Sequence, residues 1–132
     1  MVAYSFKKRF VPRIEAGSKG HTLRLPRKGS GHAKVGQQLQ LYYAMRTKYC
    51  RKIIDDQPCL RRSSIVLIFD KGELVDIEVD GKHLSDRNLE RFAVLDGFDD
   101  LSDMSLYWNE AHVSEDYSGP TIALDLIGWL PW

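Results

Sequence analysis

A lysine, a threonine and an arginine lie close together between Gly17 and Arg24, and side chains of these types could act on one ligand. The segment from His21 to Leu25 alternates polar and apolar residues, which predicts a half-buried strand. Thr22 and Arg24 are two positions apart on this strand, so they project to one face, while His21 projects to the other. Lys19 precedes the strand, and the three side chains would offer a cation, a hydroxyl and a guanidinium. Composition alone does not separate such a site from an exposed strand edge with solvated cations.

A second feature of this segment is its order: a helix that ends in glycine, then lysine, then Thr-x-Arg on a strand. It resembles the Gly-x-Lys-x-x-Thr-x-Arg motif of the ASCH family, in the PUA-like superfamily. Residues 92–98 (FAVLDGF) and the segment from Leu101 to Trp108 are similar to the acidic turn and helix that ASCH domains place beside the lysine. Residues 43–53 resemble a phage and bacterial subgroup, and the whole resemblance covers about residues 6–130.

The resemblance implies a fold and a class of activity. The fold is a single α+β domain over residues 1–132, a PUA-like small β-barrel flanked by short helices. A cleft is expected where the glycine-ended helix meets the barrel, with RNA or a nucleotide as partner and no cofactor or metal. Some ASCH proteins hydrolyse the amide of acetylated cytidine with a lysine, a threonine and a glutamate, others are reported as ribonucleases, and relatives read modified bases. The matching catalytic positions here are Lys19, Thr22 and Asp96.

Two departures from the family pattern bear on catalysis. Gly20 stands where the pattern usually has a larger side chain, and Asp96 is one methylene shorter than the glutamate of the amidohydrolases. The acid is thereby displaced by about 1.5 Å, and a misplacement of roughly 1 Å can cost on the order of a hundredfold in rate. The sequence therefore favours a binding module, with a small hydrolase acting on RNA or a modified nucleoside as the alternative.

The protonation state of Lys19 distinguishes these two readings. A threonine hydroxyl is a poor nucleophile until a base takes its proton, and lysine can be that base only if its pKa is lowered. Arg24 would lower the pKa of Lys19, whereas an ionised Asp96 would raise it. With Asp96 close and ionised, we expect Lys19 to stay charged and to bind an anion or a carbonyl.

The charge distribution points to the same class of partner. Residues 1–62 hold 15 Lys and Arg but 3 Asp and Glu, whereas residues 63–132 hold 4 and 15. Partial neutralisation between the halves is expected, with a net basic face remaining. Cations interleaved with tyrosines suit single-stranded RNA, although the tyrosines could equally be core and the cations solvated. The candidate nucleic-acid-binding residues are Arg24, Arg27, Lys28, Tyr43, Arg46, Lys48, Arg51 and Lys52.

The elements that must position these residues follow from periodicity and turn signals. Helices are predicted over 11–17, 86–94 and 101–112, with Ser85 as N-cap of the second. Phe6, Phe10 and Ile14 have helical spacing, although Pro12 argues against helix before residue 11. Strands are predicted over 21–25, 38–43, 64–69, 74–79 and 121–129, with 64–69 central; residues 26–36 form a mobile loop and 46–62 are irregular.

Length and composition set broad limits. A chain of 132 residues with 43% hydrophobic and 28% charged residues suits one globular domain. No apolar run approaches the roughly 18 residues of a membrane span, and the first residues lack a signal-peptide core, so a cytoplasmic protein is expected. Cys50 and Cys59 match neither a disulfide framework nor a zinc spacing, and two reduced thiols are expected.

Overall fold

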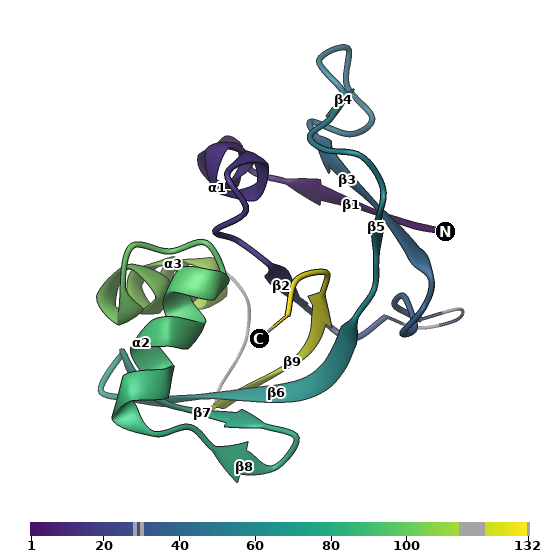
Figure 1. Cartoon of the computed structure of the whole chain (residues 1–132). Helices are drawn as coiled ribbons and strands as arrows, with labels where there is room; N and C mark the ends of the chain where they lie inside the picture. The colour runs from purple at the N-terminus through teal and green to yellow at the C-terminus, as the bar shows by residue number, and fades with distance from the viewer. Residues whose placement is uncertain (28, 30, 114–120, 132) are drawn as a thin grey trace.

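The computed structural model describes residues 1–27, 29, 31–113 and 121–131, and within them the chain is an α+β protein. Its strands form two sheets, and its longer helices lie together beside one of them (Figure 1). No helix in the described part of the chain is both long enough and apolar enough to cross a bilayer.

The larger sheet is antiparallel and contains the strand that carries the Thr-x-Arg motif. Its order is β2 (His21–Arg24), β9 (Thr121–Gly128), β6 (Arg61–Asp70), β7 (Glu73–Val79) and β8 (Lys82–His83). The β-branched run in β6 pairs with β9 on one side and β7 on the other, so the predicted central strand is confirmed. Ser63, Ile65 and Leu67 alternate inward along it, which is the two-residue period of a half-buried strand.

The smaller sheet contains a strand that sequence periodicity missed. Here β1 (Val2–Phe6) pairs in parallel with β3 (Gln38–Tyr43), and β3 also pairs with β4 (Arg51–Lys52) and β5 (Gln57–Pro58). Phe6 therefore ends a strand and lies on no helix, contrary to its helical spacing with Phe10. The physical reason is tertiary: Tyr4 and Phe6 bury alternate positions against a partner strand more than thirty residues away.

The helices are short and begin and end at recognisable signals. The 3-10 helix η1 (Lys8–Phe10) leads into α1 (Val11–Glu15), which has Pro12 in its first turn. In α2 (Asp86–Leu95), Ser85 is the N-cap, since its Oγ accepts from the Asn88 N–H at 3.3 Å. The third helix, α3 (Leu101–Val113), packs on β7, and its Ser105 hydroxyl accepts from the Leu74 N–H at 2.9 Å.

The two sheets adjoin where the chain passes from β5 into β6. The Leu60 N–H donates to the Gly128 carbonyl at 2.8 Å, and the Trp129 ring meets Phe6 edge-on with ring centres 5.9 Å apart. Buried residues of both sheets form one hydrophobic cluster. The pairings of the described strands nevertheless close no barrel, so the expected PUA-like barrel is not confirmed.

Candidate functional site

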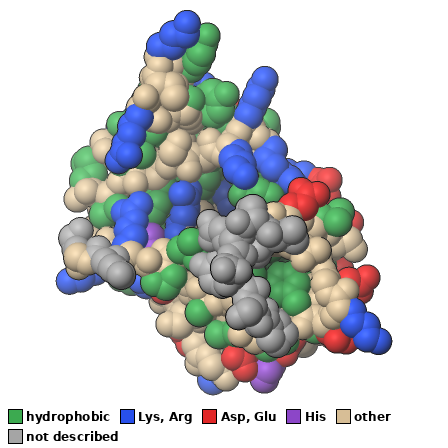
Figure 2. All heavy atoms as spheres, turned by 180° about the vertical axis from the view of Figure 1, so that it is seen from behind, with side chains coloured by type: hydrophobic (Ala, Val, Ile, Leu, Met, Phe, Trp, Pro, Cys, Tyr) green, Lys and Arg blue, Asp and Glu red, His purple; other side chains and the backbone are tan. Residues whose placement is uncertain are grey.

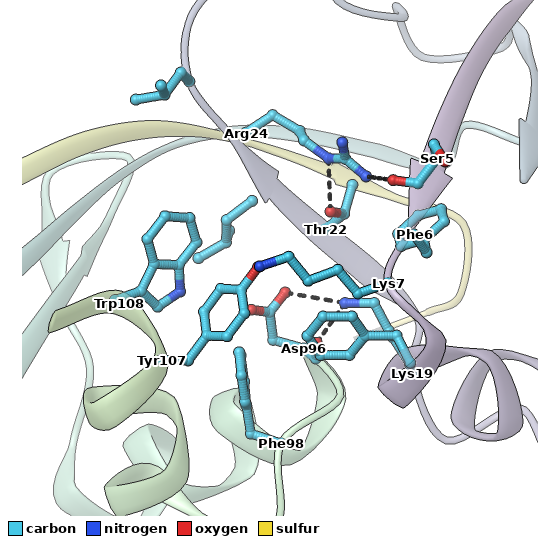
Figure 3. A pocket seen from close by; sticks show the side chains of 13 residues that line it. Ser5, Phe6, Lys7, Lys19, Thr22, Arg24, Asp96, Phe98, Tyr107 and Trp108 are labelled. Carbon is cyan, nitrogen blue, oxygen red and sulfur yellow. Dashed lines mark hydrogen bonds and ion pairs between the residues drawn. The ribbon is translucent and has the colours of Figure 1, made fainter. Parts of the chain in front are cut away.

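A cleft of about 310 Å³ lies between the N-terminal segment, the β2 strand and the helical part of the chain. This volume is at the lower end of the roughly 300–1,000 Å³ typical of small-molecule sites. Figure 3 shows Thr22 and Arg24 on one side of the cleft and the Tyr107, Trp108 and Phe98 rings on the other, with Lys19 and Asp96 between them. The lining residues include the four motif side chains, which the sequence analysis expected to converge: Lys19, Thr22, Arg24 and Asp96.

Lys19 is placed by the turn after α1. Gly17 has φ of +78°, and the backbone N–H groups of Ser18 and Lys19 both donate to the Arg13 carbonyl. The Lys19 side chain is 3% exposed, and its amine donates to the His21 carbonyl at 2.8 Å and to the Asp96 carbonyl. The Asp96 carboxylate Oδ1 lies 3.6 Å from the Lys19 amine. The ammonium is thus held by oxygen atoms within the fold.

Burial lowers the pKa of Lys19 from its ordinary 10.5 to about 8, with Asp96 opposing this effect and Arg24 adding to it. The predicted opposition between Arg24 and Asp96 is therefore present, and desolvation is larger than either. With a pKa of about 8, roughly nine in ten molecules keep the lysine charged at pH 7. At neutral pH, Lys19 is therefore a cation whose amine already donates hydrogen bonds to oxygen atoms of the fold.

His21 is a member of this network that sequence reasoning placed on the opposite face. Its Nδ1 lies 3.0 Å from Asp96 Oδ1, and its ring packs on Phe92 with centres 4.8 Å apart. Burial lowers the pKa of His21 in spite of Asp96, which favours the neutral ring. Because a carboxylate only accepts, the neutral imidazole donates from Nδ1. Asp96 therefore sits between His21 and Lys19, and no spacing signal in the sequence indicated this.

Arg24 joins the two sheets at the cleft. Its Nε donates to the Thr22 hydroxyl oxygen at 3.1 Å and its Nη2 donates to the Ser5 carbonyl at 2.8 Å (Figure 3). Its guanidinium lies 5.2 Å from the centre of the Tyr4 ring. Among the described residues the hydrogen bonds of the Lys19 amine go to backbone carbonyls and not to Thr22. The lysine–threonine pairing that hydrolysis would use is therefore not formed.

Aromatic side chains form the walls of the cleft. The Phe98 ring lies 5.5 Å from Phe10 and 5.2 Å from Tyr107, and the Lys7 amine lies 4.8 Å from the Tyr107 ring centre. The sequence analysis placed Tyr107 and Trp108 on a predicted helix beside the lysine, but it assigned none of the phenylalanines to the cleft. The aromatic lining residues are Phe6, Phe10, Phe98, Tyr107 and Trp108. Aromatic rings that face a polar side of the same cleft are suited to an aromatic ligand with polar edges.

No family model, curated protein or solved structure matches the chain. The chemistry of the cleft is therefore interpreted from its own residues.

Apart from Arg24, none of the described nucleic-acid-binding candidates lines the cleft, but one of them lies near it. The Arg27 guanidinium lies 4.9 Å from the Tyr4 ring centre, near Arg24, whereas Lys28 lies outside the described residues. Tyr43 is half-buried at the end of β3. Exposed cations follow it in the β3–β4 loop and in β4: Arg46, Lys48, Arg51 and Lys52.

The basic and acidic halves neutralise each other in part, as the sequence analysis expected. Arg9 pairs with Asp103 at 2.6 Å, Arg13 pairs with Asp99, and Arg62 pairs with Asp125 at 3.7 Å. Lys and Arg side chains still gather on the face seen in Figure 2, from the projecting loop at its top down to a central hollow. In the described part of the chain no group of three His, Cys, Asp or Glu could hold a metal, and both cysteines are free thiols.

Proposed function

We propose that the chain is an ASCH-type domain of the PUA-like superfamily that binds RNA by accepting one nucleotide in the cleft. The main support is a cleft of about 310 Å³ that combines aromatic side chains with cationic and hydroxyl-bearing ones. The polar group, called the polar floor below, consists of Lys19, Thr22, Arg24 and Asp96. A nucleobase has a π-face for the walls and hydrogen-bonding edges for the floor. The convergence of the family motif on this cleft supports the assignment, and the fold would be an open variant of the PUA-like barrel.

Each polar group has a defined part in this proposal. Thr22 accepts from Arg24 and keeps its own hydroxyl proton, so it can donate to a base carbonyl or ring nitrogen. The Arg24 guanidinium carries positive charge at the cleft, and Lys7 at the rim adds a second cation for phosphate. Lys19 and Asp96 hold the polar floor in place, because each is already engaged within the fold.

The geometry favours binding over hydrolysis. General-base catalysis would need an amine free to take the Thr22 proton, whereas the Lys19 amine donates to two carbonyls and lies beside Asp96. The Asp96 carboxylate is likewise fixed between Lys19 and His21, at 3.6 and 3.0 Å. An Asp96→Glu substitution would overpack this site, so we expect it to create no amidohydrolase.

The first prediction is that Thr22→Val weakens nucleotide binding. Titration calorimetry with the four ribonucleoside 5′-monophosphates should show binding of at least one by the wild type. Loss of one hydrogen bond, about 0.5–1.5 kcal/mol, should reduce its affinity by roughly two- to tenfold. Thr121→Val is the matched control, because Thr121 is exposed on β9 outside the cleft-lining set.

Two results would count against this function. Equal effects of Thr22→Val and Thr121→Val, or no binding of any monophosphate, would exclude the cleft as the base site. Release of acetate from acetylcytidine by the wild type, lost in Thr22→Val, would establish the hydrolase instead.

A further inference from the structure

The β3–β4 loop, residues 44–50, projects from the smaller sheet and carries cations that the cleft does not use (Figure 1). Residues 46–52 read RTKYCRK, with four basic side chains and no acidic one. Lys52 pairs with Asp56 at 2.7 Å and Arg51 lies 3.9 Å from Glu15. Arg46 and Lys48 are exposed and form no ion pair within the described residues. Two cations at the tip of the loop thus remain for an external anion.

The loop is preorganised by Thr47. The Thr47 hydroxyl donates to the Ala44 carbonyl at 2.7 Å and accepts from the Tyr49 N–H at 3.1 Å. The Thr47 N–H also donates to the Ala44 carbonyl, and Arg46 adopts a left-handed φ of +69°. A left-handed non-glycine residue is unfavourable and persists only where its surroundings fix it. The backbone that carries the tip cations is therefore ordered before any ligand arrives.

The tip also presents an aromatic surface. The Tyr49 side chain is 66% exposed, and the Lys48 amine lies 5.1 Å from the centre of its ring. An exposed large aromatic residue beside two unpaired cations offers a stacking face next to phosphate-binding charge. Proteins that bind single strands combine these two features.

Ser5 connects this loop to the cleft. Its hydroxyl oxygen accepts from the Met45 N–H at 3.2 Å, while its carbonyl accepts from Arg24 within the cleft. The next residue, Phe6, lines the cleft and pairs in register with Tyr43, after which the loop begins. Adjacent strands lie about 4.8 Å apart, so the base of the loop stands directly beside the cleft wall. Figure 2 shows Lys and Arg side chains between the projecting loop and the hollow.

We propose that the β3–β4 loop is a second subsite that binds the phosphate backbone of single-stranded RNA, whose neighbouring nucleotide occupies the cleft. This inference rests on the proposed function of the cleft. Arg46 and Lys48 contact phosphates, and Tyr49 stacks on a flanking base. The strand is single because a base inside the cleft is unstacked and unpaired. The ligand is thus an oligonucleotide of several residues rather than a free nucleotide.

The test compares the tightest-binding ribonucleoside monophosphate with the homopentamer of the same nucleotide, by calorimetry across a salt series. We expect the pentamer to bind at least tenfold more tightly. Arg46→Gln/Lys48→Gln should remove most of that advantage and reduce the salt slope by about 1.4, since each single-strand phosphate contributes about 0.7. Its affinity for the monophosphate should stay within twofold of wild type. The matched control is Lys71→Gln/Lys82→Gln, two exposed lysines outside the cleft and loop.

The possible failures are distinguishable. An unchanged pentamer advantage in the loop variant overturns the loop subsite and leaves the cleft proposal standing. Pentamer binding that depends on the loop but not on Thr22→Val overturns the cleft as the base site, and with it the joined surface. Absence of binding to either ligand overturns both.

Discussion

At the scale of single residues, Lys19 shows how a buried cation can be tolerated. Its amine gives up hydration on burial, and the Asp96 carboxylate and two carbonyl oxygens replace the lost water in part. Because this replacement is incomplete, burial lowers the pKa of Lys19 to about 8. The charged form is retained at neutral pH because Asp96 lies beside it.

A second prediction follows for the pH dependence of stability. Between about pH 8 and the ordinary 10.5, the unfolded chain keeps the Lys19 proton and the folded protein does not. The free energy of unfolding due to this group therefore rises with pH in that window, by about 2 kcal/mol from pH 8 to pH 10. Urea denaturation should show this rise in the wild type relative to Lys19→Met, which lacks the titrating amine. Parallel pH profiles for the two proteins would show that Lys19 is not desolvated.

At the scale of elements, the connection between α2 and α3 positions the acid. The Gly97 N–H donates to the Val94 carbonyl and the Phe98 N–H to the Ala93 carbonyl, closing the helix with Gly97 at φ of +100°. A Cβ atom on Gly97 would lie 2.7 Å from Lys19 Cδ and 2.9 Å from the Phe10 ring. Glycine here permits both the turn and the passage of the Lys19 side chain past the backbone.

The third prediction separates these two requirements. Gly97→Ala should lower the free energy of unfolding by about 2–4 kcal/mol, from left-handed strain and overpacking together. Gly36→Ala is the matched control: its φ is +94°, but nothing lies within 4 Å of the added Cβ. It should cost about 1–2 kcal/mol from strain alone. Equal losses in thermal or urea denaturation would contradict the close approach at Gly97.

Gly20 illustrates the same principle at the start of β2. Its added Cβ would lie 2.7 Å from Leu130 Cβ, and its carbonyl accepts from the N–H groups of Trp129 and Leu130. The small residue at this position therefore has a packing reason. The C-terminal residues after β9 occupy the space that a larger side chain would need.

At the scale of the whole molecule, opposite charges join the N-terminal segment to the helical part. Arg9 lies between them, paired with Asp103 and 5.0 Å from the Phe98 ring centre, and Arg13 pairs with Asp99. These contacts link opposite sides of the cleft. Each also pairs a basic residue of the first half of the sequence with an acidic residue of the second half.

The fourth prediction tests this link. Arg9→Gln/Arg13→Gln should lose about 1 kcal/mol of stability at low salt, since partly exposed ion pairs contribute about 0.2–1 kcal/mol each. The difference from wild type should shrink in 1 M NaCl, where the Debye length is about 3 Å. Arg87→Gln/Arg91→Gln removes two exposed charges of α2 that form no ion pair within the described residues. A loss that is equal at both salt concentrations, or equal in this control, would show that the pairs do not join the two parts.

Local sequence signals determined most of the elements. Two-residue alternation predicted β2, β3 and β7, and in β3 alternate side chains are buried as expected of a half-buried strand. In β2, however, His21, Thr22 and Leu23 are all buried, so this strand is not the half-buried strand that its alternation predicted. Proline, glycine and serine marked α1 and α2 through their backbone preferences. The motif spacing also placed Thr22 and Arg24 on one face, since residues two apart on a strand share a face, and put Lys19 in the turn just before the strand.

Only the tertiary structure decided the rest of the fold and the site. β1 depends on a parallel partner in β3, and local periodicity does not predict a pairing between segments so far apart in the sequence. The His21–Asp96 contact and the phenylalanine walls likewise join residues from different elements. The pKa of Lys19 follows from burial, which the finished fold imposes and which neighbouring charges in the sequence do not determine. Local preference specifies elements, whereas a site formed between elements is specified by how those elements pack.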